Sequence, residues 1–170
     1  MRLSPKQPPP PAAIVIFGAN GDLTKRLIVP ALYNLSREGL LPPRLALVGM
    51  DHNDKSTDDW RQALKDFLSD VLARNNESVD EKLWQPIARN MQFLKGDFTD
   101  DGAYQKLAGV LRDLDRPLEL NGNVLFYMAV ADRFFAPIAA KLGKAGLAKE
   151  EGPASGNKGF RRLIVEKPFG

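Results

Sequence analysis

Cysteine is absent from the 170-residue sequence, and histidine occurs only once. Without cysteine the chain has no disulfide framework, thiol nucleophile or cysteine-based zinc site, and we expect no metal centre. It also lacks a run of roughly 20 apolar residues, the length needed to cross a bilayer, so we expect no membrane partner. Residues 1–11 lack the apolar stretch of a secretory signal. These absences are compatible with a protein of the reducing cytoplasm.

A strong charge of one sign is missing as well. The sequence has 24 basic and 21 acidic residues, a formal net charge of +3, and the two signs are interspersed. Nucleic-acid binding generally requires a basic stripe, so we expect no nucleic-acid partner. The small excess of Lys and Arg is equally compatible with an anionic small molecule or with an ordinary mixed surface.

Short apolar runs alternate with amphipathic segments along the chain. Residues 1–11 form a proline-rich tail that we expect to be extended or disordered. The apolar run Ala12–Phe17 predicts a strand buried on both faces. Four further short apolar stretches predict strands at Arg44–Gly49, Met91–Gly96, Asn123–Val130 and Arg161–Glu166. Residues 12–170 are therefore expected to form one domain.

Apolar residues at helical spacing predict helices between these strands. The first runs over Asp22–Arg37, ends before Gly39 and is kinked at Pro30. The others run from a cap at Ser56, Thr57 or Asp58 to about Arg74, and over Asp80–Arg89, Gly102–Leu114 and Asp132–Leu147, with a flexible loop at Lys149–Gly159. The alternation predicts an α/β fold, a doubly wound parallel sheet of Rossmann-like order.

A glycine-containing turn, Gly18 to Leu23 (GANGDL), joins the first predicted strand to the first predicted helix. Glycine permits positive φ and close approach of the backbone to a ligand, and a helix N-terminus suits a pyrophosphate. A plain strand-to-helix turn also favours Gly, Asn and Asp, and the pattern is G-x-x-G without the full G-x-G-x-x-G fingerprint. Its place after the first buried strand favours a dinucleotide site.

Four stretches in order resemble the glucose-6-phosphate dehydrogenase family: IVIFGANGDLTKRLIVPALYNL, FLKGDFTD, LFYMAVADRFFAPIAAKL and VEKPFG. The resemblance implies the coenzyme-binding part of an oxidoreductase that oxidises glucose 6-phosphate at C1 to 6-phosphogluconolactone. The hydride would pass to NAD or NADP, in the first step of the pentose phosphate pathway in the cytoplasm. The resemblance also implies that the full-length enzyme is a homo-oligomer.

The resemblance assigns the coenzyme pyrophosphate to backbone N–H groups of the turn and the following helix: Gly18, Ala19, Asn20, Gly21, Asp22, Leu23, Thr24 and Lys25. We expect the Lys25 side chain to reach a phosphate and Arg26 to lie on the surface. Asp97 and Phe98 would lie near the adenosine, or they are only the exit of a strand. Ala129 and Val130 would border the nicotinamide side, or they belong to the core.

The resemblance places Lys167 where the nicotinamide and the sugar phosphate meet, as a ligand of the substrate. Its ammonium group has three donors that can orient hydroxyl groups. Pro168 restricts the backbone of Lys167 to extended conformations. Taken alone, a lysine is usually a solvated surface residue, and that alternative remains open.

The sequence departs from the family after the second predicted strand. His52 stands where similar NADP-using enzymes have an arginine for the 2′-phosphate, and Asp51 stands beside it. A carboxylate here accepts hydrogen bonds from a ribose 2′-OH and repels a 2′-phosphate, which favours NAD or dual use. Alternatively, Asp51 caps or turns the loop. Residues 129–132, AVAD, also replace the pair of prolines usual in the family.

The sequence stops four residues after the fifth predicted strand, so we expect a domain truncated there, with the substrate domain absent. Similar enzymes use a histidine base beyond this length, and His52 lies in the adenosine-side loop. We therefore expect no catalytic residue in this chain and no turnover by it alone. A short-chain reductase or an epimerase would need Tyr-x-x-x-Lys, which Tyr33, Tyr104 and Tyr127 do not provide. A non-catalytic dinucleotide sensor or interaction module remains the alternative.

Overall fold

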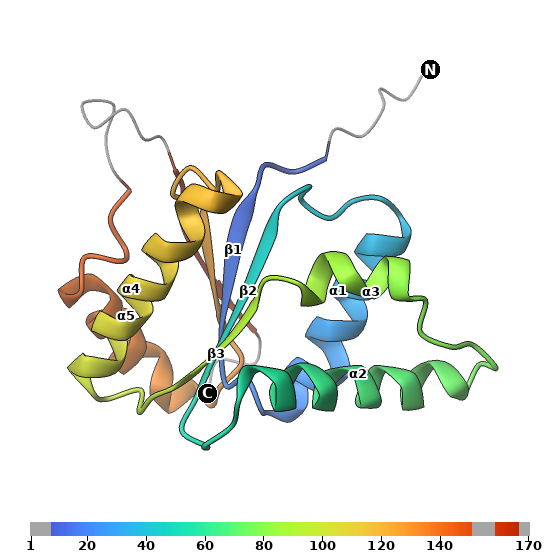
Figure 1. Cartoon of the computed structure of the whole chain (residues 1–170). Helices are drawn as coiled ribbons and strands as arrows, with labels where there is room; N and C mark the ends of the chain where they lie inside the picture. The colour runs from blue at the N-terminus through green and yellow to red at the C-terminus, as the bar shows by residue number, and fades with distance from the viewer. Residues whose placement is uncertain (1–7, 151–158, 167–170) are drawn as a thin grey trace.

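A computed structural model describes residues 8–150 and 159–166, and its centre is a parallel sheet of five strands (Figure 1). The strands are β1 (Ala12–Phe17), β2 (Leu45–Asp51), β3 (Met91–Lys95), β4 (Val124–Met128) and β5 (Arg161–Val165), in the order β3-β2-β1-β4-β5. All four neighbouring pairs are parallel. The predicted fold class is confirmed.

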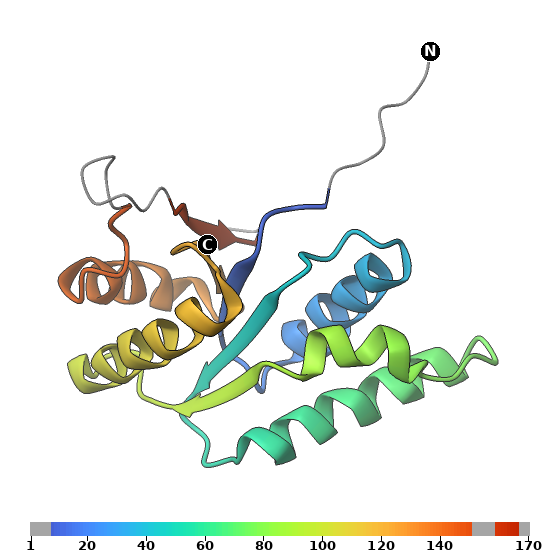
Figure 2. The ribbon, with the colours of Figure 1, turned by 45° about the horizontal axis from the view of Figure 1, so that its top comes forward.

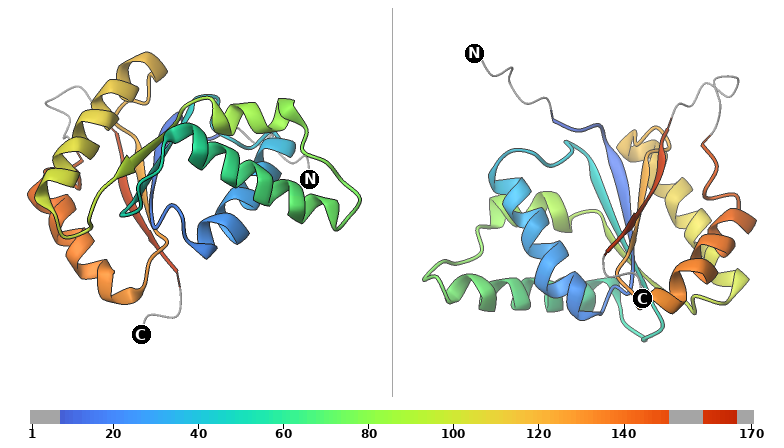
Figure 3. Two further views of the ribbon diagram at one scale, coloured as in Figure 1. Left: turned by 60° about the horizontal axis from the view of Figure 1, so that its bottom comes forward. Right: turned by 180° about the vertical axis from the view of Figure 1, so that it is seen from behind.

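Helices cover both faces of the sheet (Figure 2). One layer contains α1 (Val29–Arg37), α2 (Thr57–Ala73) and α3 (Glu81–Ala88), and the other contains α4 (Asp101–Leu118) and α5 (Phe135–Lys144). Figure 3 shows the sheet between these two layers. Side chains alternate between the faces, so that Val15 and Phe17 pack in one core and Ile16 packs in the other.

The first helix departs from α geometry before Pro30. A π-helical turn, η1 (Thr24–Ile28), precedes α1, and the N–H of Val29 bonds the carbonyl of Thr24 five residues earlier. The kink was predicted at Pro30, which cannot donate a backbone hydrogen bond. A π turn is a common site of helix distortion, and here it lies immediately before that proline.

Two predicted helices have different ends in the structure. The helix predicted over Gly102–Leu114 is α4, which continues to Leu118 and ends where Glu119 has a φ of +50°. Pro117 lies in its last turn, and a proline there removes only one hydrogen bond. The helix predicted over Asp132–Leu147 begins with a 3₁₀ turn, η2 (Asp132–Phe134), and its α-helical part ends at Lys144.

Other local predictions are confirmed. Ser56 is the N-cap of α2, and its hydroxyl accepts a hydrogen bond from the N–H of Asp59 at 3.0 Å. Gly39 follows the end of α1 with a φ of +66°. In the part of the chain that the structure describes, none of the helices combines the length and the apolar character that a membrane span requires.

The strand order reverses at β1, with β2 and β3 on one side and β4 and β5 on the other. Phe17 at the end of β1 is paired with Met50 of β2 and with Met128 of β4. The segments that follow these three strands therefore meet at one edge of the sheet. In open α/β folds this edge, at the point of reversal, is where ligands bind.

Candidate functional site

At Gly18, the first residue after β1, the structure leaves no room for a side chain. Its φ is +86°, and a Cβ atom there would lie 2.2 Å from the carbonyl oxygen of Ala129. The N–H of Gly18 bonds the carbonyl of Met50 at 3.0 Å, and its own carbonyl accepts the N–H of Gly21 at 2.9 Å. The turn therefore packs directly against the ends of β2 and β4, as glycine allows.

Buried side chains hold the carbonyls of this turn. The hydroxyl of Thr24 donates to the Gly18 carbonyl at 3.0 Å, and the indole N–H of Trp60 donates to the Ala19 carbonyl at 3.0 Å. Thr24 is fully buried and Trp60 is almost so. Sequence reasoning did not identify Trp60, because its position marks it only as an apolar residue of α2.

The side-chain amide of Asn20 lacks hydrogen-bond partners in the described part of the chain. Its oxygen and its nitrogen are both buried, and neither has a hydrogen-bond partner among the described residues. An unpaired buried polar atom is costly, and most such atoms in proteins are paired. A polar ligand seated on the turn would satisfy this amide.

Asp51, the last residue of β2, binds the same turn. Its carboxylate accepts the N–H of Asn20 at 2.9 Å and the N–H of His52 at 2.8 Å, and it is only 5% exposed. Nδ1 of His52 lies 2.9 Å from the same carboxylate. The residue therefore fastens the glycine turn to the end of β2, and it also lines the cavity at this edge of the sheet.

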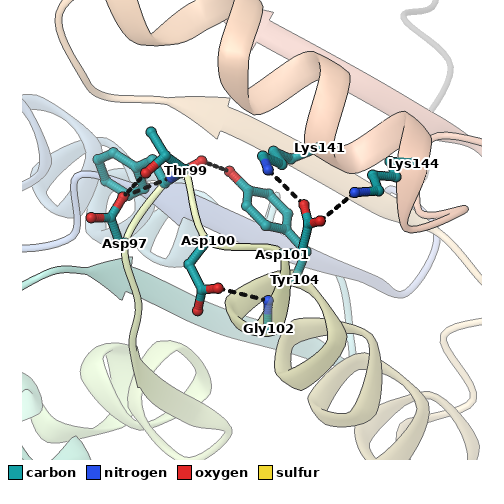
Figure 4. A network of polar contacts seen from close by, with 9 residues as sticks. Asp97, Thr99, Asp100, Asp101, Gly102, Tyr104, Lys141 and Lys144 are labelled. Carbon is teal, nitrogen blue, oxygen red and sulfur yellow. Dashed lines mark hydrogen bonds and ion pairs between the residues drawn. The ribbon is translucent and has the colours of Figure 1, made fainter.

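The segment after β3 is held by a network of polar contacts (Figure 4). The Asp97 carboxylate accepts the N–H and the hydroxyl of Thr99, each at 2.7 Å, and the hydroxyl bond is the main cause of the lowered pKa of Asp97. The hydroxyl of Tyr104 donates to the carbonyl of Phe98 at 2.8 Å. Burial raises the pKa of Tyr104 above its usual range.

The N-terminal end of α4 is also tied to α5. The Asp101 carboxylate pairs with Lys141 at 2.6 Å and with Lys144 (Figure 4). The hydrogen bond from Lys141 is the main reason that the pKa of Asp101 is lowered. These contacts fix the position of the loop that carries Asp97 and Phe98.

A cavity of about 400 Å³ opens between the segments at the ends of β1, β2, β3 and β4. It is lined by Gly18, Asp51, His52, Asp97, Phe98, Val130, Ala131, Arg133 and Phe134. Its walls are apolar where Phe98 and Phe134 meet edge to face, with ring centroids 5.5 Å apart. An apolar wall with a few polar groups at its margin is typical of a small-molecule site, and the volume suits an adenosine-sized group.

Most residues predicted from the sequence lie at this edge of the sheet. Gly18, Asp51, His52, Asp97 and Phe98 line the same cavity. Arg133 and Phe134 line it too and were missed, although they belong to the stretch LFYMAVADRFFAPIAAKL that carries the family resemblance.

Other predicted residues do not line this cavity or cannot be placed. Ala129 is 9% exposed and packs in the core, although its carbonyl faces Gly18. Lys25 is partly buried in η1, and Arg26 pairs with Asp22 on the surface at 2.6 Å. Lys167 lies outside the described residues.

Comparison with known proteins agrees with this geometry. Residues 15–170 match the family described as "Glucose-6-phosphate dehydrogenase, NAD binding domain". Glucose-6-phosphate 1-dehydrogenase 2 of Mycobacterium tuberculosis is 35% identical over 160 residues, which cover 94% of this chain and 30% of the relative. The glucose-6-phosphate 1-dehydrogenase of Chlamydia pneumoniae is 35% identical over 161 residues, covering 95% of this chain and 30% of the relative.

A solved structure of a glucose-6-phosphate dehydrogenase in complex with its substrate glucose-6-phosphate has a TM-score of 0.79 and 30% identity to this chain. The match covers 98% of this chain and 32% of that one. The chain thus spans about 30% of the length of the curated relatives. Because the family match extends over nearly all of the sequence, this chain belongs to the glucose-6-phosphate dehydrogenase family and corresponds to its NAD binding domain.

Proposed function

We propose that this chain is the coenzyme-binding part of a cytoplasmic, homo-oligomeric glucose-6-phosphate dehydrogenase. The observation that carries the proposal is the cavity beside the Gly18 turn, at the point where the strand order reverses. The adenosine of a nicotinamide dinucleotide occupies this cavity, between the ends of β2 and β3 and the residues after β4. The pyrophosphate lies against the glycine turn.

The first helical turn binds the pyrophosphate. The N–H groups of Gly18, Ala19, Asn20 and Gly21 already have acceptors within the protein. The N–H groups of Asp22, Leu23 and Thr24 lie in the first turn of the helix, where backbone donors generally have no partner within the helix and where the dipole favours an anion. The unpaired amide of Asn20 and the ammonium group of Lys25 complete this set of ligands.

The bound nicotinamide supplies the acceptor for the hydride that leaves C1 of glucose 6-phosphate as the lactone forms. This chain's residues bind and orient the coenzyme, and Ala129 borders its nicotinamide side. Lys167 binds the substrate. The C1 hydroxyl also requires a general base. His52 lies at the adenosine end, paired with Asp51, so the chain alone binds coenzyme without turning over substrate.

The charge of the adenosine end favours NAD or the use of both coenzymes. Two carboxylates, Asp51 and Asp97, line the cavity beside His52. A carboxylate at the end of the second strand accepts a hydrogen bond from the ribose 2′-OH of NAD. The same charge repels the 2′-phosphate of NADP.

Calorimetric titration of the chain with NAD+ and with NADP+ tests the proposal. We expect binding of at least one coenzyme, and Gly18→Ala should weaken it by about tenfold or more, because backbone strain and overpacking each cost about 1–3 kcal/mol. Gly143→Ala is the matched control, since a Cβ atom there meets nothing within 4 Å. Wild-type protein that binds neither coenzyme, or Gly18→Ala protein that binds like wild type, would contradict the proposal.

A further inference from the structure

Arg133, which follows β4 in the turn η2, lines the adenosine-side cavity from the side opposite to β2. Its guanidinium carbon lies 4.8 Å from the centroid of the Phe134 ring. Phe134 in turn contacts Phe98, so that the arginine stands at the margin of the apolar wall. A stacked guanidinium loses little conformational freedom when it binds a ligand.

The guanidinium of Arg133 has no carboxylate partner among the described residues. The neighbouring Asp132 carboxylate accepts the backbone N–H of Arg133 at 2.8 Å and forms no ion pair with its side chain. His52, the other potential cation of the cavity, directs Nδ1 to Asp51. Of the groups that line the cavity, Arg133 thus provides the positive charge that remains available to a ligand.

The adenosine end therefore combines two carboxylates with one arginine that has no ion-pair partner in the part of the chain that the structure describes. A 2′-phosphate placed there would be repelled by Asp51 and Asp97, and it would need a cation to be accepted. The planar fork of an arginine matches the oxygens of a phosphate and can bind them through two hydrogen bonds. The uncharged 2′-OH of NAD does not need a cation.

We propose that Arg133 is the residue that admits NADP+ to this site, by binding the phosphate on the ribose 2′ oxygen. This inference rests on the proposed coenzyme-binding function. It assigns recognition of the 2′-phosphate to the segment after β4, across the cavity from His52. The same cavity then accepts both coenzymes, NAD+ through Asp51 and NADP+ through Arg133.

The test compares Arg133→Ala with wild type by calorimetric titration with NAD+, NADP+, 5′-AMP and 2′,5′-ADP. Hydrogen bonds to charged groups contribute about 1.5–3 kcal/mol, so we expect Arg133→Ala to weaken the binding of NADP+ and 2′,5′-ADP by about tenfold or more. The affinities for NAD+ and 5′-AMP should change by less than about twofold, which corresponds to a small fraction of that free energy. Arg133→Lys should retain part of the NADP+ affinity, because it keeps the charge and loses the fork.

Arg162→Ala is the matched control. Arg162 is also an exposed arginine stacked on an aromatic neighbour, 4.4 Å from the Phe160 ring, but it lies in β5 and does not line the cavity. If Arg133→Ala weakened the binding of all four ligands equally, the arginine would be assigned to the adenine and the inference would be overturned. No weakening of binding at all would also overturn it. Binding of NAD+ without NADP+ by wild type would overturn it and leave the proposed function intact. Wild-type protein that binds neither coenzyme would overturn both this inference and the proposed function.

Discussion

At the residue scale, Asp51 has a structural role and an electrostatic role. Its carboxylate accepts the backbone N–H groups of Asn20 and His52, and its charge faces the adenosine-side cavity. Asparagine in this place removes the charge and keeps one acceptor oxygen, and because the two N–H groups bond different oxygens of Asp51, one of them loses its acceptor. Substitution by alanine would instead leave both N–H groups without their acceptor, which costs about 1–3 kcal/mol for each buried group.

We therefore expect Asp51→Asn to raise the affinity for NADP+ relative to NAD+ by about three- to tenfold, which corresponds to about 1 kcal/mol of relieved repulsion. Calorimetric titration with the two coenzymes measures the ratio. Asp54→Asn serves as the control, because Asp54 is exposed, pairs with Lys95 and does not line the cavity. An unchanged ratio in Asp51→Asn would show that this carboxylate does not set coenzyme preference.

The sequence predicted those site residues whose role depends on backbone conformation. It did not predict the site residues that act through packing. Gly18 was predicted because a strand-to-helix turn needs positive φ, and the structure gives it +86°. Trp60 and Phe134 reach the site only through tertiary contacts, which apolar spacing does not reveal. Asp51 was correctly placed at the end of a strand, but its bond to the N–H of Asn20, 31 residues away, has no local signal.

At the scale of elements, parallel strands were the easiest part to predict. The central strands β1 and β2 are short, almost entirely apolar runs that are buried between the helical layers, and every predicted boundary of the five strands lies within two residues of the observed one. Helix ends were less predictable. The continuation of α4 past Leu114 and the π turn before Pro30 depend on packing against the sheet and not on local propensity.

Tyr104 of α4 provides a test of how one element positions another. Its hydroxyl donates to the buried Phe98 carbonyl, and Tyr104→Phe would leave that carbonyl unpaired. We expect Tyr104→Phe to lower the free energy of unfolding at neutral pH by about 1–2 kcal/mol, measured by urea titration. Tyr33→Phe is a useful comparison, because the Tyr33 hydroxyl instead accepts the N–H of Asp80 beside α3.

The same residue predicts a dependence on alkaline pH. Burial raises the pKa of Tyr104 in the folded protein above the value in the unfolded chain, about 10. The stabilisation by the protonated hydroxyl is complete below that pH, and it is lost as the pH rises through the higher folded value. Wild type should therefore lose stability above about pH 10, and Tyr104→Phe should lose less. Parallel losses in the two proteins would exclude Tyr104 as the cause.

At the scale of the whole molecule, the helices do not cover the sheet evenly. The helices α1, α2 and α3 form one core with β1 and β2, in which Leu32 of α1 is 6% exposed. On the same face, an apolar groove of about 420 Å³ runs between the first helix and the strands β1, β4 and β5. Leu27 and Leu35 line this groove, and they are 58% and 40% exposed.

This difference predicts losses of stability of different size for the same chemical change within one helical segment. Leu32→Ala removes a buried side chain and should lower the free energy of unfolding by about 2–5 kcal/mol, because a cavity remains in the core. Leu27→Ala and Leu35→Ala remove side chains that water already reaches, and alanine has a high helix propensity, so each should cost less than about 1 kcal/mol. Urea unfolding of the three variants measures the contrast. Equal losses would mean that the side chains of Leu27 and Leu35 contribute to the core as much as that of Leu32, which also borders the groove.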